Sequence, residues 1–118
     1  MRILIVEDNQ KLAKYIKQIL EESGYAVDVV HDGETGERMA DSNEYDLVIL
    51  DIRMPDVDGM EVLRQIRENN IPGKVVMLTA VGELKYAQDS LDLGASDFMT
   101  KPVDLNDLLT CINRTLAS

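Results

Sequence analysis

Residues 47–63 read LVILDIRMPDVDGMEVL, and this stretch decides the fold class. It opens with Leu47–Leu50, an unbroken run of large aliphatic residues. Such a run indicates a strand buried on both faces, as in a parallel sheet covered by helices. The run ends at an acid, Asp51, and a turn bracketed by Pro55 and Gly59 leads into a segment with helical spacing. The stretch therefore predicts a buried strand, a turn and a helix.

The rest of the chain repeats this pattern. Further apolar runs with the length of strands are Ile3–Val6, Ala26–Val30, Val75–Leu78 and Asp97–Met99. Residues with helical spacing follow each run, at Leu12, Ile16, Ile19 and Leu20; Met39 and Ala40; Val62, Leu63 and Ile66; Leu84, Ala87 and Leu91; and Leu105, Leu108, Leu109, Ile112 and Leu116. Gly24 and Gly94 should end the first and fourth helices, Pro72 should follow the third, a turn is expected at Asp32-Gly33, and Asp104 should cap the last helix. Strand and helix alternate five times, which predicts an α/β fold with a doubly wound, five-stranded parallel sheet.

Composition limits the classes of function. A chain of 118 residues with 45% hydrophobic residues suits one compact domain. Its net charge of −10 should repel nucleic acid, so no direct nucleic acid binding is expected. A single cysteine, Cys111, excludes an internal disulfide and fits a reducing compartment. No apolar run is long enough to span a bilayer, and no signal peptide is evident. We expect a cytoplasmic domain with no membrane contact.

Acidic residues follow two of the predicted strands. Glu7 and Asp8 come after the first strand, and Asp51 ends the third. Ligands of open parallel sheets bind at the carboxyl ends of the strands, so these acids should converge. Carboxylates packed together repel, and a hard cation relieves the repulsion, which favours Mg²⁺ with Mn²⁺ as a surrogate. The alternative for a single acid is a solvated or capping role, and Asp8 could simply be a helix N-cap.

Two more polar side chains should reach the same edge of the sheet. Thr79 ends the fourth strand and Lys101 follows the fifth. A carboxylate such as Asp51 can attack a phosphoryl group and form an acyl phosphate. A lysine ammonium and a threonine hydroxyl could then bind phosphoryl oxygens. Alone, Lys101 reads equally well as surface charge and Thr79 as a β-branched strand residue; their shared position is what favours a site.

Four motifs occur in order at strand ends: Glu7-Asp8, Asp51 within LVILDIRMPDVDGMEVL, Leu78-Thr79-Ala80, and residues 94–102, which read GASDFMTKP. With these motifs the sequence resembles the receiver domain of bacterial two-component response regulators, from Met1 to about Leu116. The resemblance implies a flavodoxin-like (βα)5 fold with strand order 2-1-3-4-5. It also implies that residues 1–118 are one receiver domain, which stands alone or is the N-terminal part of a longer regulator.

The resemblance implies a role for each acid. Asp51 would accept the phosphoryl group from a phosphohistidine on a sensor histidine kinase. Asp8 and Asp51 would bind Mg²⁺ directly, together with the backbone carbonyl of Arg53. Glu7 would act on the ion mostly through water. Arg53 and Val81, which lie two positions past Asp51 and Thr79, would tune the access of water to the acyl phosphate.

The phosphoryl oxygens and the switch are implied in the same way. Lys101 and Thr79 would hold the phosphoryl oxygens, with the backbone N–H groups of Ile52 and Ala80 nearby. On phosphorylation Thr79 would move toward the phosphoryl group and Phe98 would turn inward. The surface formed by the fourth helix, fifth strand and fifth helix would then change and control an output. Such a domain promotes its own phosphoryl transfer and its autodephosphorylation, but it is a signalling switch and not an enzyme.

Family members with a DNA-binding output domain commonly dimerise through that surface when phosphorylated. Asp92 and Asp97 match the acidic side of the interface. Cys111 and Asn113 stand where basic residues would be expected, which counts against the usual symmetric dimer. A fused or separate output domain and transcription regulation are compatible with the sequence, but these residues do not show them.

Three other functions compete with this one. A haloacid-dehalogenase-type phosphatase would need a second acid where Arg53 stands, and a longer chain. A flavodoxin-like electron carrier would need a Ser/Thr-rich phosphate loop in place of Glu7-Asp8-Asn9. A phosphorylation-independent receiver-like interaction module would normally lack one of four residues that are all present, namely Asp8, Asp51, Thr79 and Lys101.

Overall fold

The computed structural model describes residues 1–118 as alternating strands and helices. The strands are β1 (Arg2–Val6), β2 (Ala26–Val30), β3 (Leu47–Asp51), β4 (Lys74–Thr79) and β5 (Asp97–Thr100). The helices are α1 (Gln10–Glu22), α2 (Gly33–Ser42), α3 (Gly59–Glu68), α4 (Leu84–Asp92) and α5 (Leu105–Ala117), with a 3₁₀ turn, η1 (Val81–Glu83), before α4. All five predicted strands and all five predicted helices are present. None of the helices combines the length and the apolar character that crossing a membrane requires.

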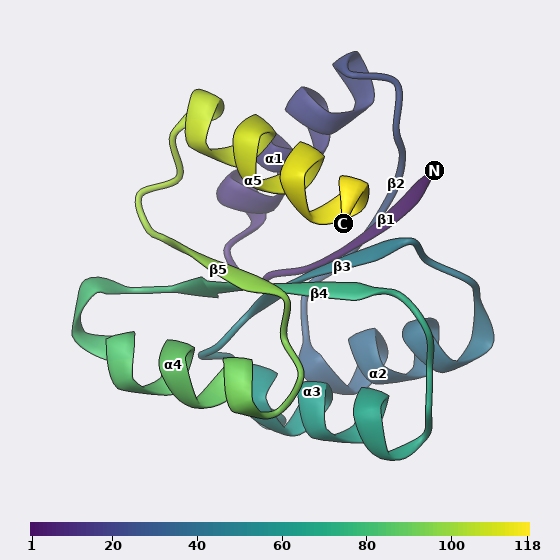
Figure 1. Cartoon of the computed structure of the whole chain (residues 1–118), viewed down its shortest axis with the longest axis vertical. Helices are drawn as coiled ribbons and strands as arrows, with labels where there is room; N and C mark the ends of the chain where they lie inside the picture. Colours follow the sequence, from purple (N-terminus) through teal and green to yellow (C-terminus); the bar gives the residue numbers. More distant parts are fainter.

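The strands form one parallel sheet in the order β2-β1-β3-β4-β5, which confirms the predicted fold class and strand order. Figure 1 shows α1 and α5 on one side of the sheet and α2, α3 and α4 on the other. A parallel connection between neighbouring strands needs a crossover, and a helix supplies it here each time.

Burial on both faces explains the continuous aliphatic runs. In β1, Ile3 and Ile5 pack under α1 and α5, whereas Leu4 and Val6 pack toward α2 and α3. In the same way β3 and β4 divide their side chains between the two cores. Because successive side chains of a strand point to opposite faces, a strand with helices on both sides must be apolar at every position.

The helix ends differ from the predictions in one place that matters for function. Asn9, not Asp8, caps α1, and its side chain accepts a hydrogen bond from the N–H of Leu12 at 3.1 Å. The reading of Asp8 as an N-cap is therefore wrong. Asp32 belongs to a cap rather than a free turn, since its side chain accepts from Thr35 N at the start of α2. Asp104 caps α5 as predicted.

Helix α4 is less buried than its sequence pattern indicates. Ala87 is fully buried, but Leu84 is 46% and Leu91 42% exposed. The predicted apolar stripe of the fourth helix therefore only partly faces the core.

Gly59 fixes the distance between α3 and the end of β3. A Cβ atom on Gly59 would stand 1.9 Å from the carbonyl oxygen of Asp51, far inside the van der Waals contact distance. The Gly59 N–H also donates to the carbonyl of Ile52 at 2.8 Å. The start of α3 is thus held against the backbone next to Asp51, and only glycine fits there.

Candidate functional site

The carboxyl ends of β1 and β3 bring three acids together. Ligand oxygens of Glu7, Asp8 and Asp51 all lie within 4.8 Å of one another. The side chain of Glu7 is fully buried, Asp51 is 2% exposed, and Asp8 lies at the surface. The predicted convergence of these acids is confirmed. It follows from the pairing of β1 with β3, which sets Val6 beside Leu50 and so places the next residues side by side.

Lys101, directly after β5, reaches into this acidic cluster. Its Nζ lies 2.9 Å from Glu7 Oε1 and 3.2 Å from Asp51 Oδ2. These are ion-pair contacts rather than well-aligned hydrogen bonds, and Glu7 Oε1 is left without a hydrogen-bond donor. The other oxygen of Glu7 accepts from the N–H of Asn9 at 3.1 Å. The cluster therefore contains one cation for three acids, and a buried oxygen with spare acceptor capacity.

The electrostatics of the cluster perturb its titration. Burial, followed by the neighbouring Glu7, raises the pKa of Asp51 to about 8. Burial opposes ionisation of Asp8 as well, but hydrogen bonding with Glu7 and Asp51 outweighs it and lowers the pKa of Asp8. Burial would lower the pKa of Lys101, yet its contacts with Glu7 and Asp51 prevail and raise it. Without a further cation, burial and the neighbouring Glu7 thus oppose ionisation of Asp51.

These donors fit a hard divalent cation. All of the clustered ligand atoms are carboxylate oxygens, and neither histidine nor cysteine joins them. Oxygen-only sites with few carboxylates suit Mg²⁺ or Mn²⁺ rather than zinc. A divalent ion would also offset the repulsion among these carboxylates and would favour the ionised form of Asp51, whose pKa is raised.

The groups at the end of β4 that are predicted to hold phosphoryl oxygens follow the strand paired with β3, and they are engaged with protein acceptors. The Thr79 hydroxyl donates to the carbonyl of Ala80 at 3.1 Å, and the Ala80 N–H donates to the carboxylate of Glu83 at 3.2 Å. Sequence patterns do not single out Glu83, because a lone acid in a turn looks the same whether or not it bonds to a backbone amide.

The two backbone amides after Asp51 differ in availability. The Ile52 N–H donates to Leu78 O at 3.0 Å and so continues the pairing of β3 with β4. The Arg53 N–H instead faces Asp51 Oδ1 at 3.4 Å. The geometry therefore does not favour the Ile52 amide as a phosphoryl donor, and it offers the Arg53 amide in its place.

Residues of β5 and α5 lie farther from the acids. Phe98 is half-buried against the core on the α2–α4 side of the sheet. Asp97 forms an ion pair with Arg114 of the same chain. Cys111 is buried at 4% exposure beside Asp97. Its position on α5 is therefore not one from which a basic side chain would reach another chain. His31 is exposed, and its Nδ1 lies 3.0 Å from the carbonyl of Glu7, in agreement with a turn position.

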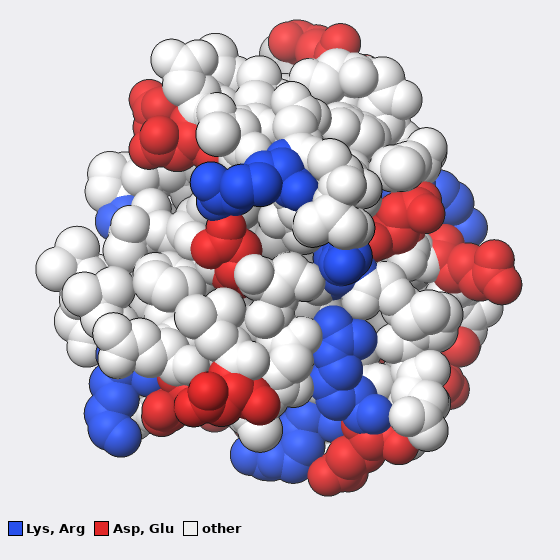
Figure 2. All heavy atoms as spheres, in the orientation of Figure 1, with Lys and Arg blue, Asp and Glu red and all other residues white.

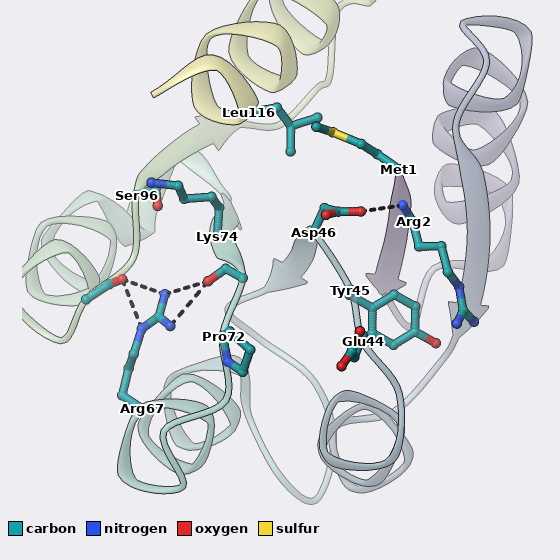
Figure 3. A pocket seen from close by; sticks show the side chains of 12 residues that line it. Met1, Arg2, Glu44, Tyr45, Asp46, Arg67, Pro72, Lys74, Ser96 and Leu116 are labelled. Atoms are coloured by element: carbon teal, nitrogen blue, oxygen red, sulfur yellow. Dashed lines mark hydrogen bonds between the residues drawn. The ribbon is translucent and has the colours of Figure 1, made fainter.

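The largest cleft lies at the opposite, amino edge of the sheet. It has a volume of about 970 Å³. Figure 3 shows the Arg67 guanidinium beside it, donating to the carbonyls of Gly73 and Gly94. Asp46 accepts from the backbone N–H of Arg2 at 2.7 Å. The polar contacts of Arg67 and Asp46 at this edge thus hold neighbouring loops and strand ends together.

The face drawn in Figure 2 carries side chains of both charges. Groups of Lys and Arg side chains lie beside groups of Asp and Glu side chains on this face.

Comparison with known proteins gives consistent matches. The family model of the response regulator receiver domain matches residues 3–113 of this chain. Response regulator ArlR of Staphylococcus saprophyticus subsp. saprophyticus is 42% identical over 115 residues, which are 98% of this chain and 52% of that protein. Transcriptional regulatory protein CusR of Escherichia coli strain K12 is 40% identical over 116 residues, 98% of this chain and 51% of that protein. The chain spans about half the length of these curated relatives.

Solved structures give the same result. The CheY-like response regulator receiver domain protein of Methanospirillum hungatei JF-1 has a TM-score of 0.92 at 34% identity, covering 98% of this chain and 93% of that one. A response regulator receiver domain protein of Clostridium thermocellum has a TM-score of 0.91 at 32% identity, covering 98% of this chain and 94% of that one.

Proposed function

Because this chain belongs to the response regulator receiver domain family, we propose that it accepts a phosphoryl group on Asp51 from a phosphohistidine of a sensor kinase. The observation that carries the proposal is the arrangement around Asp51. This carboxylate lies among Glu7 and Asp8, the donors for a cation, and 3.2 Å from the ammonium of Lys101. Transfer of a phosphoryl group is favoured by a metal cation and by an ammonium group, because both offset the negative charge on the transferring oxygens.

The transfer exchanges one bond for another. An oxygen of ionised Asp51 attacks phosphorus and forms the P–O bond of an acyl phosphate, while the bond from phosphorus to the donor imidazole nitrogen breaks. The nitrogen keeps the electron pair of the broken bond. Lys101 is positioned to pair with one phosphoryl oxygen, and the Thr79 hydroxyl would reach another after turning away from the Ala80 carbonyl.

Mg²⁺, held by Asp8, Asp51 and the Arg53 carbonyl with Glu7 acting through water, would neutralise charge on the carboxylates and on the transferring oxygens. The raised pKa of Asp51 supports this assignment, because a protonated carboxyl is a poor nucleophile and a cation would displace the proton. We propose the backbone N–H groups of Arg53 and Ala80 as further donors to the phosphoryl group.

Phosphorylation would act as a switch. Movement of Thr79 toward the phosphoryl group would let the half-buried Phe98 turn inward, and the surface formed by α4, β5 and α5 would change. Hydrolysis of the acyl phosphate would reset it, so the domain signals and does not turn over an external substrate. Dimerisation through that surface would require Asp97 to exchange Arg114 of its own chain for a partner.

The lengths of the relatives support one more element of the proposal. Since the chain spans about half of CusR and ArlR, we propose that residues 1–118 act as the receiver part of a longer cytoplasmic transcriptional regulator.

Intact mass measurement tests the acceptor. We expect a phosphoryl mass to be added by acetyl phosphate and Mg²⁺, to be absent with EDTA, and to be absent in Asp51→Asn. Persistence of the added mass in Asp51→Asn would refute the assignment. If neither acetyl phosphate nor beryllofluoride binds to the wild type, the phosphorylation-independent interaction module becomes the better account.

A further inference from the structure

Glu83 joins the loop that follows β3 to the loop that follows β4. It is the last residue of η1, directly before α4. One carboxylate oxygen accepts from the N–H of Ala80 at 3.2 Å, and the other accepts from Nε of Arg53. The Glu83 side chain is only 15% exposed, although it belongs to a surface turn. Both of its oxygens are therefore occupied by donors that border the site.

The Arg53 side chain is held in place from a second side. Its guanidinium carbon lies 4.8 Å from the centre of the Tyr86 ring, in the range of a cation–π contact. Arg53 follows β3 and Tyr86 lies in α4, so Glu83 and Tyr86 together draw the loop after β3 toward the start of α4. Val81, two positions past Thr79, is 74% exposed and takes no part in these contacts.

These contacts conflict with phosphoryl binding. Ala80 offers a single backbone N–H, and a carboxylate oxygen and a phosphoryl oxygen cannot both accept it at full strength. Glu83 also places a carboxylate charge at the Ala80 amide, which disfavours the approach of an anionic phosphoryl oxygen to that amide. The Arg53 guanidinium, which could face a phosphoryl group, is neutralised by the same carboxylate.

We propose that Glu83 is an internal competitor of the phosphoryl group. Its carboxylate occupies the Ala80 amide and the Arg53 guanidinium in the resting protein, and phosphorylation of Asp51 requires its displacement. Glu83 is thus a positioning residue that lowers the affinity of the site for phosphoryl oxygens. The proposal rests on the proposed function of Asp51.

Beryllofluoride binding in the presence of Mg²⁺ tests the competition. Glu83→Gln keeps an acceptor oxygen for the Ala80 amide but loses the charge and the ion pair with Arg53. The matched control is Glu61→Gln, since Glu61 pairs with Arg64 and Gln65 of its own helix. We expect Glu83→Gln to bind beryllofluoride about three- to tenfold tighter than the wild type, and Glu61→Gln to match the wild type. Equal or weaker binding by Glu83→Gln would overturn the proposal. That result is expected if Glu83 only caps the start of η1 through the Ala80 N–H.

A second measurement does not depend on phosphoryl chemistry. In the metal-free protein the Ala80 amide proton, bonded to a carboxylate, should resonate downfield and move upfield in Glu83→Gln. An identical amide shift in the two proteins would refute the contact on which the competition depends. Absence of beryllofluoride binding by all three proteins would overturn the proposed function itself, whereas equal binding by all three would overturn only the role of Glu83.

Discussion

Replacement of Asp51 by asparagine should stabilise the metal-free protein, and the gain should grow as the pH rises. Burial and then the neighbouring Glu7 raise the pKa of Asp51 from 3.8 to about 8. A carboxyl group whose pKa is higher in the folded state favours folding while it is protonated in both states. That contribution is lost as the pH rises from about 4 to about 8, because the unfolded chain then releases its proton more readily. The side chain of asparagine does not titrate in this range, so Asp51→Asn does not lose stability for this reason.

The size of the gain follows from the change in pKa. One pKa unit corresponds to about 1.4 kcal/mol, so a carboxyl group that titrated alone from 3.8 to about 8 would lose about 6 kcal/mol above pH 8. Asp51 does not titrate alone, because Glu7 and Asp8 share its site and Lys101 lies 3.2 Å away. We therefore expect about half of this, a gain of about 2–3 kcal/mol near pH 8.5 and below about 1 kcal/mol near pH 4.5.

Urea denaturation in EDTA measures this difference directly. The wild type, Asp51→Asn and a control, Asp41→Asn at an exposed position of α2, would be compared at both pH values. The control should not change with pH in this way. A stability difference for Asp51→Asn that is the same at both pH values, or a loss of stability at the higher one, would refute the electrostatic account of the cluster.

Three further predictions concern the cation, Gly59 and the contacts of Arg67 with loop carbonyls. Mg²⁺ should raise the melting temperature and release up to about one proton per ion below pH 8, as seen by calorimetry in two buffers, and Asp8→Asn should remove most of the rise; no proton release would contradict the raised pKa of Asp51. Gly59→Ala should cost about 3 kcal/mol or more in urea denaturation, since its Cβ would meet a carbonyl at 1.9 Å, and an unchanged midpoint would contradict this. Arg67→Met should cost about 1–3 kcal/mol because three carbonyls, those of Ile71, Gly73 and Gly94, lose a charged donor, whereas Lys85→Met, which breaks an exposed pair, should cost under about 0.5 kcal/mol.

The fold could be predicted because its signals are local. The unbroken run Leu47–Leu50 is apolar since both faces of β3 are covered, and that requirement is visible without knowing the partners. Helix α4 was less predictable. Leu84 and Leu91 have helical spacing, but whether a neighbouring helix covers them depends on the packing of distant segments, and here they are largely exposed.

The candidate site also has a part that could be predicted from the sequence and a part that could not. Glu7, Asp8 and Asp51 could be placed together because parallel strands end at one edge of the sheet. The contact between Glu83 and Ala80 could not, since it depends on how a turn closes over the sheet. The Ile52 amide is committed to Leu78 for a related reason: β3 and β4 continue their pairing one residue beyond the acid, and sequence periodicity does not show where pairing stops.

The most direct test of the central claim is the position of the acyl phosphate. After incubation with acetyl phosphate and Mg²⁺, borohydride reduces an aspartyl phosphate to homoserine, which tandem mass spectrometry of peptides can locate. Phosphoryl transfer as proposed predicts homoserine at residue 51 and its loss when EDTA replaces Mg²⁺. Reduction at another residue, such as the neighbouring Asp8, with Asp51 unmodified would contradict it.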